Sequence, residues 1–111
     1  MNIQIFGAKK CQDTRKAERY FKERGIPFQY VDLTVRGLSK GELAKVQAAV
    51  GLDNLLDKDG KEYAKRNLKY IVHDPAEMLL SCPLLLRTPI VRNGPQATVG
   101  YRPEVWGSWD K

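Results

Sequence analysis

Cys11 is the residue of this sequence whose type and surroundings point most directly to chemistry. It follows a short apolar segment and precedes a segment with helical periodicity. Four basic residues surround it: Lys9, Lys10, Arg15 and Lys16. Positive charge and a helix start both stabilise a thiolate, the reactive form of cysteine. A buried structural cysteine is the alternative, but the loop position argues against it. We therefore predict a nucleophilic Cys11, with Lys10 and Arg15 helping to hold the thiolate.

Thr14 occupies the position three residues after Cys11, where a dithiol mechanism would need a second cysteine. The Thr14 hydroxyl either donates a hydrogen bond to the thiolate or caps the following helix. The other cysteine, Cys82, lies at the apolar end of a predicted helix, and we expect it to be unreactive. Without a neighbouring thiol, oxidised Cys11 must be resolved by glutathione, by another protein or by a distant thiol.

Composition and charge exclude several other classes of function. His73 is the only histidine, so the chain offers neither a Cys/His zinc cluster nor a convincing Cys-His pair, and we expect no bound metal. The net charge of +6 comes from basic residues dispersed among acids, which argues against direct nucleic-acid binding and favours attraction of small anions. The sequence shows no signal pattern, no membrane-spanning run and no disulfide framework, so we expect a cytoplasmic protein without a membrane partner.

The elements that must position Cys11 can be predicted from hydrophobic periodicity. Residues 2–6 alternate apolar and polar side chains as a strand does, and residues 14–24 carry an apolar helical stripe that ends at Gly25. A second strand is expected over residues 27–31. A strand, a helix and a strand in this order form a β-α-β unit with parallel strands and a right-handed crossover.

The rest of the chain is predicted to form a helical insert followed by a hairpin and a last helix. Helices are expected over residues 40–50, 61–72 and 75–81, the first opened by a Ser39/Glu42 capping box and the second with Ala64, Leu68 and Ile71 on its inner face. Residues 51–54 and 57–60 are expected to break the helices. Strands over residues 89–92 and 96–100 flank an Asn93-Gly94 turn, and a short helix begins at Pro103. The predicted fold is a single α/β domain over residues 1–111, with a four-stranded mixed sheet, flanking helices and a helical insert between the β-α-β and β-β-α halves.

This order of elements, with a cysteine before the first helix, resembles the thioredoxin-like fold. Residues 10–17, 83–91 and 99–103 also resemble the arsenate reductase (ArsC)/Spx/YffB family, and the likeness covers essentially the whole chain. The resemblance implies a thiol-dependent oxidoreductase with one nucleophilic cysteine, glutathione as co-substrate, no bound cofactor, and an oxyanion such as arsenate or a disulfide as substrate. Glutaredoxin is a further implied partner. The alternatives are an Spx-like regulatory protein that binds a transcription partner and a catalytically silent family member.

The resemblance also implies roles for residues outside the first loop. Pro89 corresponds to a cis-proline beside the active cysteine, so Thr88-Pro89 would shape the pocket and leave the Thr88 backbone free to pair with a thiol substrate. Arsenate reductases of the family use three arginines. Arg102 matches one, Arg87 is displaced by one position from another, and Asp57 stands where the third is expected. A displacement by one turns a strand side chain to the other face. Arg102 and Arg87 are the predicted residues for an anion or a glutathione carboxylate.

Overall fold

The computed structural model describes residues 2–66 and 74–109 of the 111-residue chain. Strand β1 (Ile3–Gly7), helix α1 (Gln12–Glu23) and strand β2 (Phe28–Asp32) form the predicted β-α-β unit, with β1 and β2 parallel. Helix α1 buries the predicted apolar stripe against the sheet. The chain leaves the helix through Gly25, whose φ of 66° is a conformation that glycine adopts at little cost.

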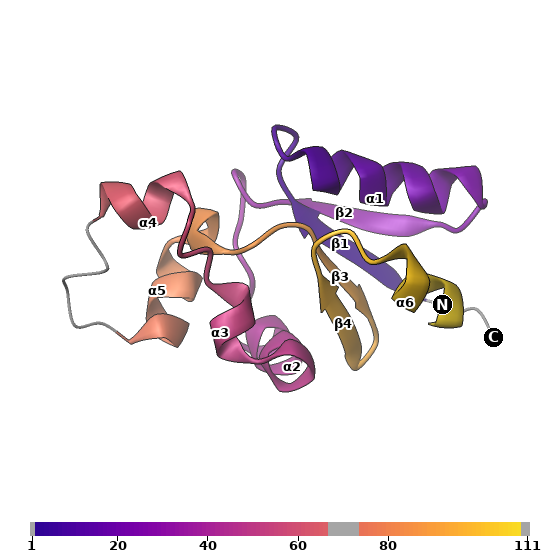
Figure 1. The fold of residues 1–111 in the computed structure, drawn as a ribbon. Helices are drawn as coiled ribbons and strands as arrows, with labels where there is room; N and C mark the ends of the chain where they lie inside the picture. Colours follow the sequence, from indigo (N-terminus) through magenta and orange to yellow (C-terminus); the bar gives the residue numbers. More distant parts are fainter. Residues whose placement is uncertain (1, 67–73, 110–111) are drawn as a thin grey trace.

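Strands β3 (Ile90–Asn93) and β4 (Gln96–Val99) form the predicted antiparallel hairpin. Gly94 in its turn has a φ of 60°, as hairpin turns of this kind require. Strand β3 also pairs antiparallel with β1, which gives the strand order β2-β1-β3-β4. The described residues therefore contain the predicted four-stranded mixed sheet, with β2 and β4 at its two edges (Figure 1).

The helical insert between the two halves of the sheet is also present. Its helices are α2 (Lys40–Val50), α3 (Leu52–Leu55), α4 (Lys61–Lys65) and α5 (Pro75–Ser81), and a 3₁₀ helix (Pro83–Leu85) follows them. The predicted capping box opens α2: Glu42 N donates to Ser39 Oγ at 3.2 Å, and Ser39 N donates to Glu42 Oε1 at 2.9 Å. Asp74 caps α5 by accepting from the backbone N–H of Ala76 at 3.0 Å.

Two details of the insert differ from the prediction. Gly51 ends α2 as predicted, but Leu52–Leu55 then form the short helix α3, whose last residue, Leu55, is fully buried in the core. Helix α4 ends at Lys65, and Ala64, predicted on its inner face, is exposed, whereas Tyr63 packs against the core. The predicted inner-face residues Leu68 and Ile71, and also His73, lie outside the described residues.

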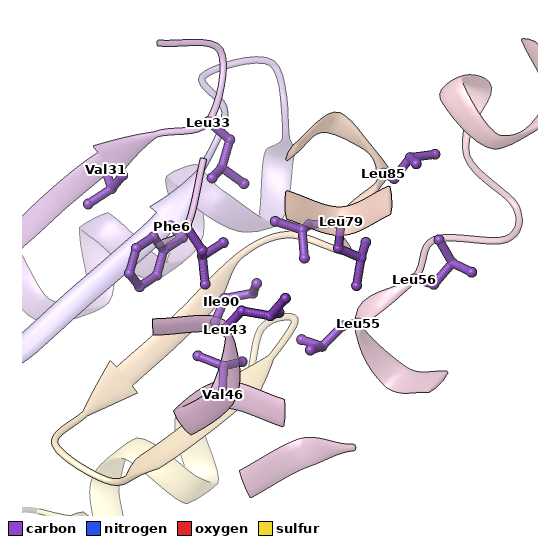
Figure 2. Packing of buried hydrophobic residues seen from close by; sticks show 12 residues of the cluster. Phe6, Val31, Leu33, Leu43, Val46, Leu55, Leu56, Leu79, Leu85 and Ile90 are labelled. Carbon is purple, nitrogen blue, oxygen red and sulfur yellow. The ribbon is translucent and has the colours of Figure 1, made fainter. Parts of the chain in front are cut away.

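The sheet separates two hydrophobic cores. One lies between the sheet and the insert, as Figure 2 shows, and consists of Phe6, Val31, Leu33, Leu38, Leu43, Val46, Leu55, Leu56, Leu79, Leu85, Leu86 and Ile90. The other lies beneath α1 and the last helix, α6 (Pro103–Trp109), and consists of Ile3, Ile5, Ala17, Tyr20, Phe21, Val91 and Trp106. Trp106 Nε1 donates to Thr98 Oγ1 at 2.8 Å, which fixes α6 on the sheet. None of the described helices is long and apolar enough to span a bilayer.

Candidate functional site

Cys11 lies where the chain passes from β1 into α1. Its own N–H donates to the carbonyl of Ala8 at 2.9 Å, which closes a tight turn after β1. Cys11 is the N-cap residue of α1, so the first N–H groups of the helix, which have no partner within the helix, surround it. The thiol is partly buried. This position combines access for a substrate with the positive end of the helix dipole.

The Thr14 side chain lies beneath the thiol. Thr14 is fully buried, and its Oγ1 has no hydrogen-bond partner among the described residues. Once the thiol ionises, this hydroxyl can donate to the sulfur. The N-cap of α1 is Cys11 and shows no side-chain cap. The alternative that Thr14 caps the helix is therefore wrong, because Thr14 already lies inside the first turn.

Gly7 holds Thr14 in this position. A Cβ atom placed on Gly7 would lie 2.5 Å from both Oγ1 and Cγ2 of Thr14. Only a residue without a side chain lets the end of β1 approach the first turn of α1 this closely. The glycine at the end of the strand therefore sets where the Thr14 hydroxyl lies relative to the thiol.

Thr88 approaches the thiol from the other half of the chain. The Cys11 Sγ–H group points to the carbonyl oxygen of Thr88 at 3.7 Å. The peptide bond between Thr88 and Pro89 is cis, as the resemblance predicted. Thr88 and Pro89 immediately precede β3, so the sheet places them beside the start of α1. Thr88 therefore forms part of the wall around the sulfur.

These neighbours make the Cys11 thiol more acidic than an ordinary cysteine. Burial raises its pKa, but hydrogen bonds from the hydroxyls of Thr14 and Thr88, and from the backbone N–H groups of Thr14 and Asp13, outweigh burial. The net pKa lies below the ordinary value of 9.0. Lys10 and Arg15 are exposed, and within the described residues no hydrogen bond joins either of them to the sulfur. Their effect on the thiolate stays a prediction.

Tyr30 is a polar group near this site that the sequence analysis did not single out. Its hydroxyl is buried and has no hydrogen-bond partner in the part of the chain that the structure describes. Burial raises the pKa of Tyr30, and the negative charges of Asp32, Glu18 and Cys11 raise it further. The phenol therefore stays protonated when Cys11 ionises. The alternation of side chains along the second predicted strand could have drawn attention to Tyr30, because it places this residue on the same face as Phe28 and Asp32.

Arg87 and Arg102 lie together in one hollow of about 470 Å³. Its lining residues are Val50, Asn54, Arg87, Ala97, Thr98, Val99, Arg102 and Val105, and Cys11 is not among them. Arg87 Nε donates to the carbonyl of Leu56 at 3.2 Å, while Arg102 is exposed and lies 3.8 Å from Glu104. The structure thus brings the two predicted arginines together, but around a space that the thiol does not line.

Asp57 and Cys82 occupy positions that bear on the predicted chemistry. The carboxylate of Asp57 faces Gly60 across the next turn, since a Cβ on Gly60 would lie 2.6 Å from Asp57 Oδ2. Asp57 does not line the hollow of the two arginines.

Cys82 is a free, partly buried cysteine at the end of α5, and it forms no disulfide with Cys11. No group of three or more potential metal ligands occurs within residues 2–66 and 74–109.

Comparison with known proteins gives a consistent result for most of the chain. A family model described as the ArsC family matches residues 6–109. Global transcriptional regulator Spx 2 of Oceanobacillus iheyensis is 30% identical over 107 residues, which cover 91% of this chain and 78% of that protein. Among solved structures, the YffB protein has a TM-score of 0.84 at 21% identity and covers 96% of this chain and 97% of its own.

An arsenate reductase from Vibrio cholerae has a TM-score of 0.80 at 22% identity, over 95% of this chain and 94% of that one. At such identities the two solved structures establish the fold alone, and that fold is the thioredoxin-like one that the order of elements predicted.

Proposed function

The chain belongs to the ArsC family, and we propose that it is a thiol-dependent oxidoreductase in which Cys11 is the single nucleophile and glutathione the reductant. The observation that carries the proposal is the Thr14 hydroxyl, which is buried beneath Cys11 without another partner. A buried donor without an acceptor is costly unless the site uses it. The thiolate supplies that acceptor, and the hydrogen bond keeps the pKa of Cys11 below 9.0.

The reaction follows from a lone thiolate. The sulfur of Cys11 attacks the glutathione sulfur of a mixed disulfide, the substrate leaves as its own thiolate and takes a proton from water, and Cys11 is left bonded to glutathione. A second glutathione thiolate then attacks that bond, which releases glutathione disulfide and restores Cys11. One disulfide is consumed and one is formed, so two glutathione molecules end as the oxidised product. Thr14 in place of a second cysteine is the reason that the resolving thiol comes from outside the chain.

We propose a disulfide as the substrate in preference to an oxyanion. Reduction of a tetrahedral oxyanion requires cationic donors around the anion while the thiolate attacks it. Arg87 and Arg102 line a hollow that Cys11 does not share, and Asp57 stands where a third arginine is expected. In the proposal, Lys10 and Arg15 supply positive charge near the sulfur, and Thr88 and Pro89 shape its wall. The role predicted for Arg87 and Arg102, binding a carboxylate of glutathione, stays a prediction, because Cys11 does not line their hollow.

The decisive experiment compares two substrates on one set of variants. Cys82→Ser serves as the reference, and Cys11→Ser is added to it. Turnover is followed with excess glutathione, either on a glutathione mixed disulfide or on arsenate. We expect turnover of the disulfide by the reference protein and its complete loss in the Cys11→Ser variant. Equal rates in both proteins on both substrates would rule out the proposed chemistry, and a higher rate on arsenate than on the disulfide would reverse the substrate order.

A regulatory role is the second candidate, because the relative that is 30% identical is named as a global transcriptional regulator. Thr14 replaces the second cysteine that a local redox switch would need, but docking on a transcription partner requires no disulfide. Analytical gel filtration of this chain with RNA polymerase purified from the same organism tests this role. Elution at separate volumes contradicts it. An ordinary pKa at Cys11, with no turnover and no partner, would leave a catalytically silent family member.

A further inference from the structure

Strand β4 presents an unused row of backbone hydrogen-bonding groups. It is an edge strand of the sheet in the described residues, and its inner side pairs with β3. In an antiparallel pair, residues that exchange hydrogen bonds alternate with residues whose N–H and C=O groups point outward. The hydrogen bond from Gly100 N to Pro89 O, at 2.8 Å, shows which residues of β4 bond to β3 and which point outward.

The alternation makes Ala97 and Val99 the outward-pointing residues. Pro89 and Gly100 form a bonded pair, so Val91 and Thr98, two residues further along each strand, form the next one. Ala97 and Val99 lie between these pairs, and their backbone groups point away from β3. No backbone hydrogen bond from outside the sheet reaches either residue in the described chain. Two residues at this spacing offer the donors and acceptors that an added strand requires.

The open edge of β4 coincides with the hollow of the two arginines. Ala97, Thr98 and Val99 all line it, which shows that the hollow runs along the strand edge. The end of α2 and helix α3 border it on one side with Val50 and Asn54, and α6 borders it on the other with Val105. Figure 1 shows β4 between α2 and α6 in this way. The hollow therefore has a backbone floor and partly apolar side walls.

The charge of the hollow selects the chemistry of its occupant. Arg87 and Arg102 contribute two guanidinium groups, and no acidic residue among those that the structure describes lines the space. Within the described residues, the Arg87 side chain makes one hydrogen bond, from Nε to Leu56 O. Arg102 lies 3.8 Å from Glu104, and an exposed ion pair of this kind contributes little free energy. Guanidinium groups next to a free strand edge fit carboxylates that alternate along an extended peptide.

We propose that the β4 hollow binds an extended acidic segment of a partner protein, which adds a fifth strand beside Ala97 and Val99 and places its carboxylates on Arg87 and Arg102. A volume of about 470 Å³ exceeds what one tetrahedral anion fills and is in the range of pockets for larger ligands. A second copy of this chain would bring the same arginines and another net charge of +6 to the interface. The interaction does not depend on thiol chemistry, because Cys11 does not line the hollow.

The first test measures binding of a fluorescent synthetic peptide of alternating glutamate and valine. The protein carries Cys11→Ser and Cys82→Ser, so any binding is separate from the proposed reductase activity. The variant Ala97→Pro removes an outward N–H and adds a ring at the strand edge, a change that an edge strand tolerates. We expect at least about tenfold weaker binding, which corresponds to roughly 1.4 kcal/mol. Equal affinity of both proteins would overturn the proposal.

A second pair of variants tests the charge. Arg102→Gln should weaken peptide binding, and the matched change Arg19→Gln on the exposed face of α1, outside the hollow, should leave it unchanged. Equal losses of affinity in Arg102→Gln and Arg19→Gln would show that peptide binding depends only on net charge, and the proposed binding site at β4 would then be wrong.

Amide hydrogen exchange in the protein with an unaltered β4 keeps the proposal testable if Ala97→Pro fails to fold. The peptide should slow exchange at Ala97 and Val99, and change it little at Thr98, whose N–H already bonds to β3. Inorganic phosphate should compete for the arginines without protecting these amides. Two results would overturn the proposal: no protection by the peptide, or protection without peptide that grows with protein concentration, which would identify a second copy as the occupant.

Discussion

Thr14 is the residue through which the site affects both reactivity and stability. Its buried hydroxyl has no hydrogen-bond partner among the described residues, which costs free energy, and its side chain helps to lower the pKa of Cys11. The same atom therefore opposes folding slightly and favours the thiolate. Separating the two effects requires a substitution that keeps the shape of the side chain and removes the hydroxyl.

Thr14→Val should raise the pKa of Cys11 toward 9.0 without destabilising the fold. Valine fills the same volume and removes an unsatisfied buried hydroxyl, so the free energy of unfolding should stay within about 1 kcal/mol of the original or rise. The pH dependence of alkylation, in a Cys82→Ser background, gives the pKa, and urea unfolding gives the stability. Thr14→Ser, which keeps the hydroxyl, is the matched control. An unchanged alkylation midpoint in Thr14→Val would remove Thr14 from the site.

Cys11 should also make stability depend on pH. Its pKa is lower in the folded chain than in the unfolded chain, so between these two values the unfolded chain binds more protons. Stability then rises with pH through this window, and the contribution of Cys11 is lost as pH falls through the folded pKa. Urea unfolding of Cys82→Ser, with and without Cys11→Ser, from about pH 6 to about pH 9 measures it. A stability difference between the two proteins that stays constant over this range would contradict the lowered pKa.

At the scale of elements, the close approach of β1 and α1 connects the sheet to the thiol. Strand β1 ends at Gly7, which touches Thr14 in the first turn of α1, and Leu33 N donates to Gly7 O at 2.9 Å just beyond β2. The end of the strand is therefore fixed from both sides. A displacement of β1 relative to α1 would therefore move the Thr14 hydroxyl relative to the sulfur of Cys11.

Gly7→Ala should destabilise the protein and reduce the acidity of Cys11 together. The added Cβ would overlap Thr14 by a wide margin, and relief of such overpacking typically costs about 1–3 kcal/mol. Gly41→Ala in α2 is the matched control, because a Cβ there meets no atom within 4 Å and should stabilise the helix by about 0.5–1 kcal/mol. Urea unfolding and alkylation of both variants check this. A destabilised Gly7→Ala protein with an unchanged alkylation midpoint would separate the packing from the site.

At the scale of the whole molecule, one sheet holds two cores together. The insert packs on the face that carries Phe6 and Ile90, and α1 and α6 pack on the face that carries Ile5 and Val91. Because the same strands, β1 and β3, supply both faces, loss of either core removes the support of the other. We therefore expect the insert and the α1 face to unfold in one cooperative transition.

Leu55→Ala tests this coupling from the insert. Leu55 is fully buried, so the change should cost about 2–5 kcal/mol. Tryptophan fluorescence reports on Trp106, on the opposite face of the sheet, and its unfolding midpoint should fall together with the loss of helical circular dichroism. Leu84→Ala, at a side chain that is 51% exposed, should shift either signal by no more than about 0.5 kcal/mol. Two separate transitions in the Leu55→Ala protein would show that the insert unfolds alone.

Most of the fold could be predicted from the sequence because local signals agreed with the final structure. The apolar stripe of α1, the capping box at Ser39 and the turn at Gly94 each correspond to an observed feature. Helix α3 was missed because burial of Leu55, a tertiary effect, overrides the sequence pattern that predicted a break. Helix α4 ends at Lys65 instead of continuing as predicted, and Ala64, predicted on its inner face, is exposed, whereas the rest of the predicted helix lies outside the described residues.

The site was predictable only in part, for a similar reason. Cys11 could be identified from its place between a strand and a helix. The distances that matter, from Thr14 to Gly7 and from Cys11 to Thr88, depend on how the sheet and α1 pack, and sequence spacing does not give them. The shared hollow of Arg87 and Arg102 depends on the meeting of three separate segments.

Cys11 and Thr88 lie 77 positions apart, and this separation ties the acidity of the thiol to completion of the chain during synthesis. The ribosome delivers Cys11 and Thr14 early, whereas Thr88, whose hydroxyl also lowers the pKa of Cys11, emerges only with the C-terminal half. A nascent chain therefore carries a less acidic sulfur than the finished protein. Oxidation follows the thiolate fraction, so the sulfur becomes most sensitive to oxidants only after Thr88 has been placed beside it.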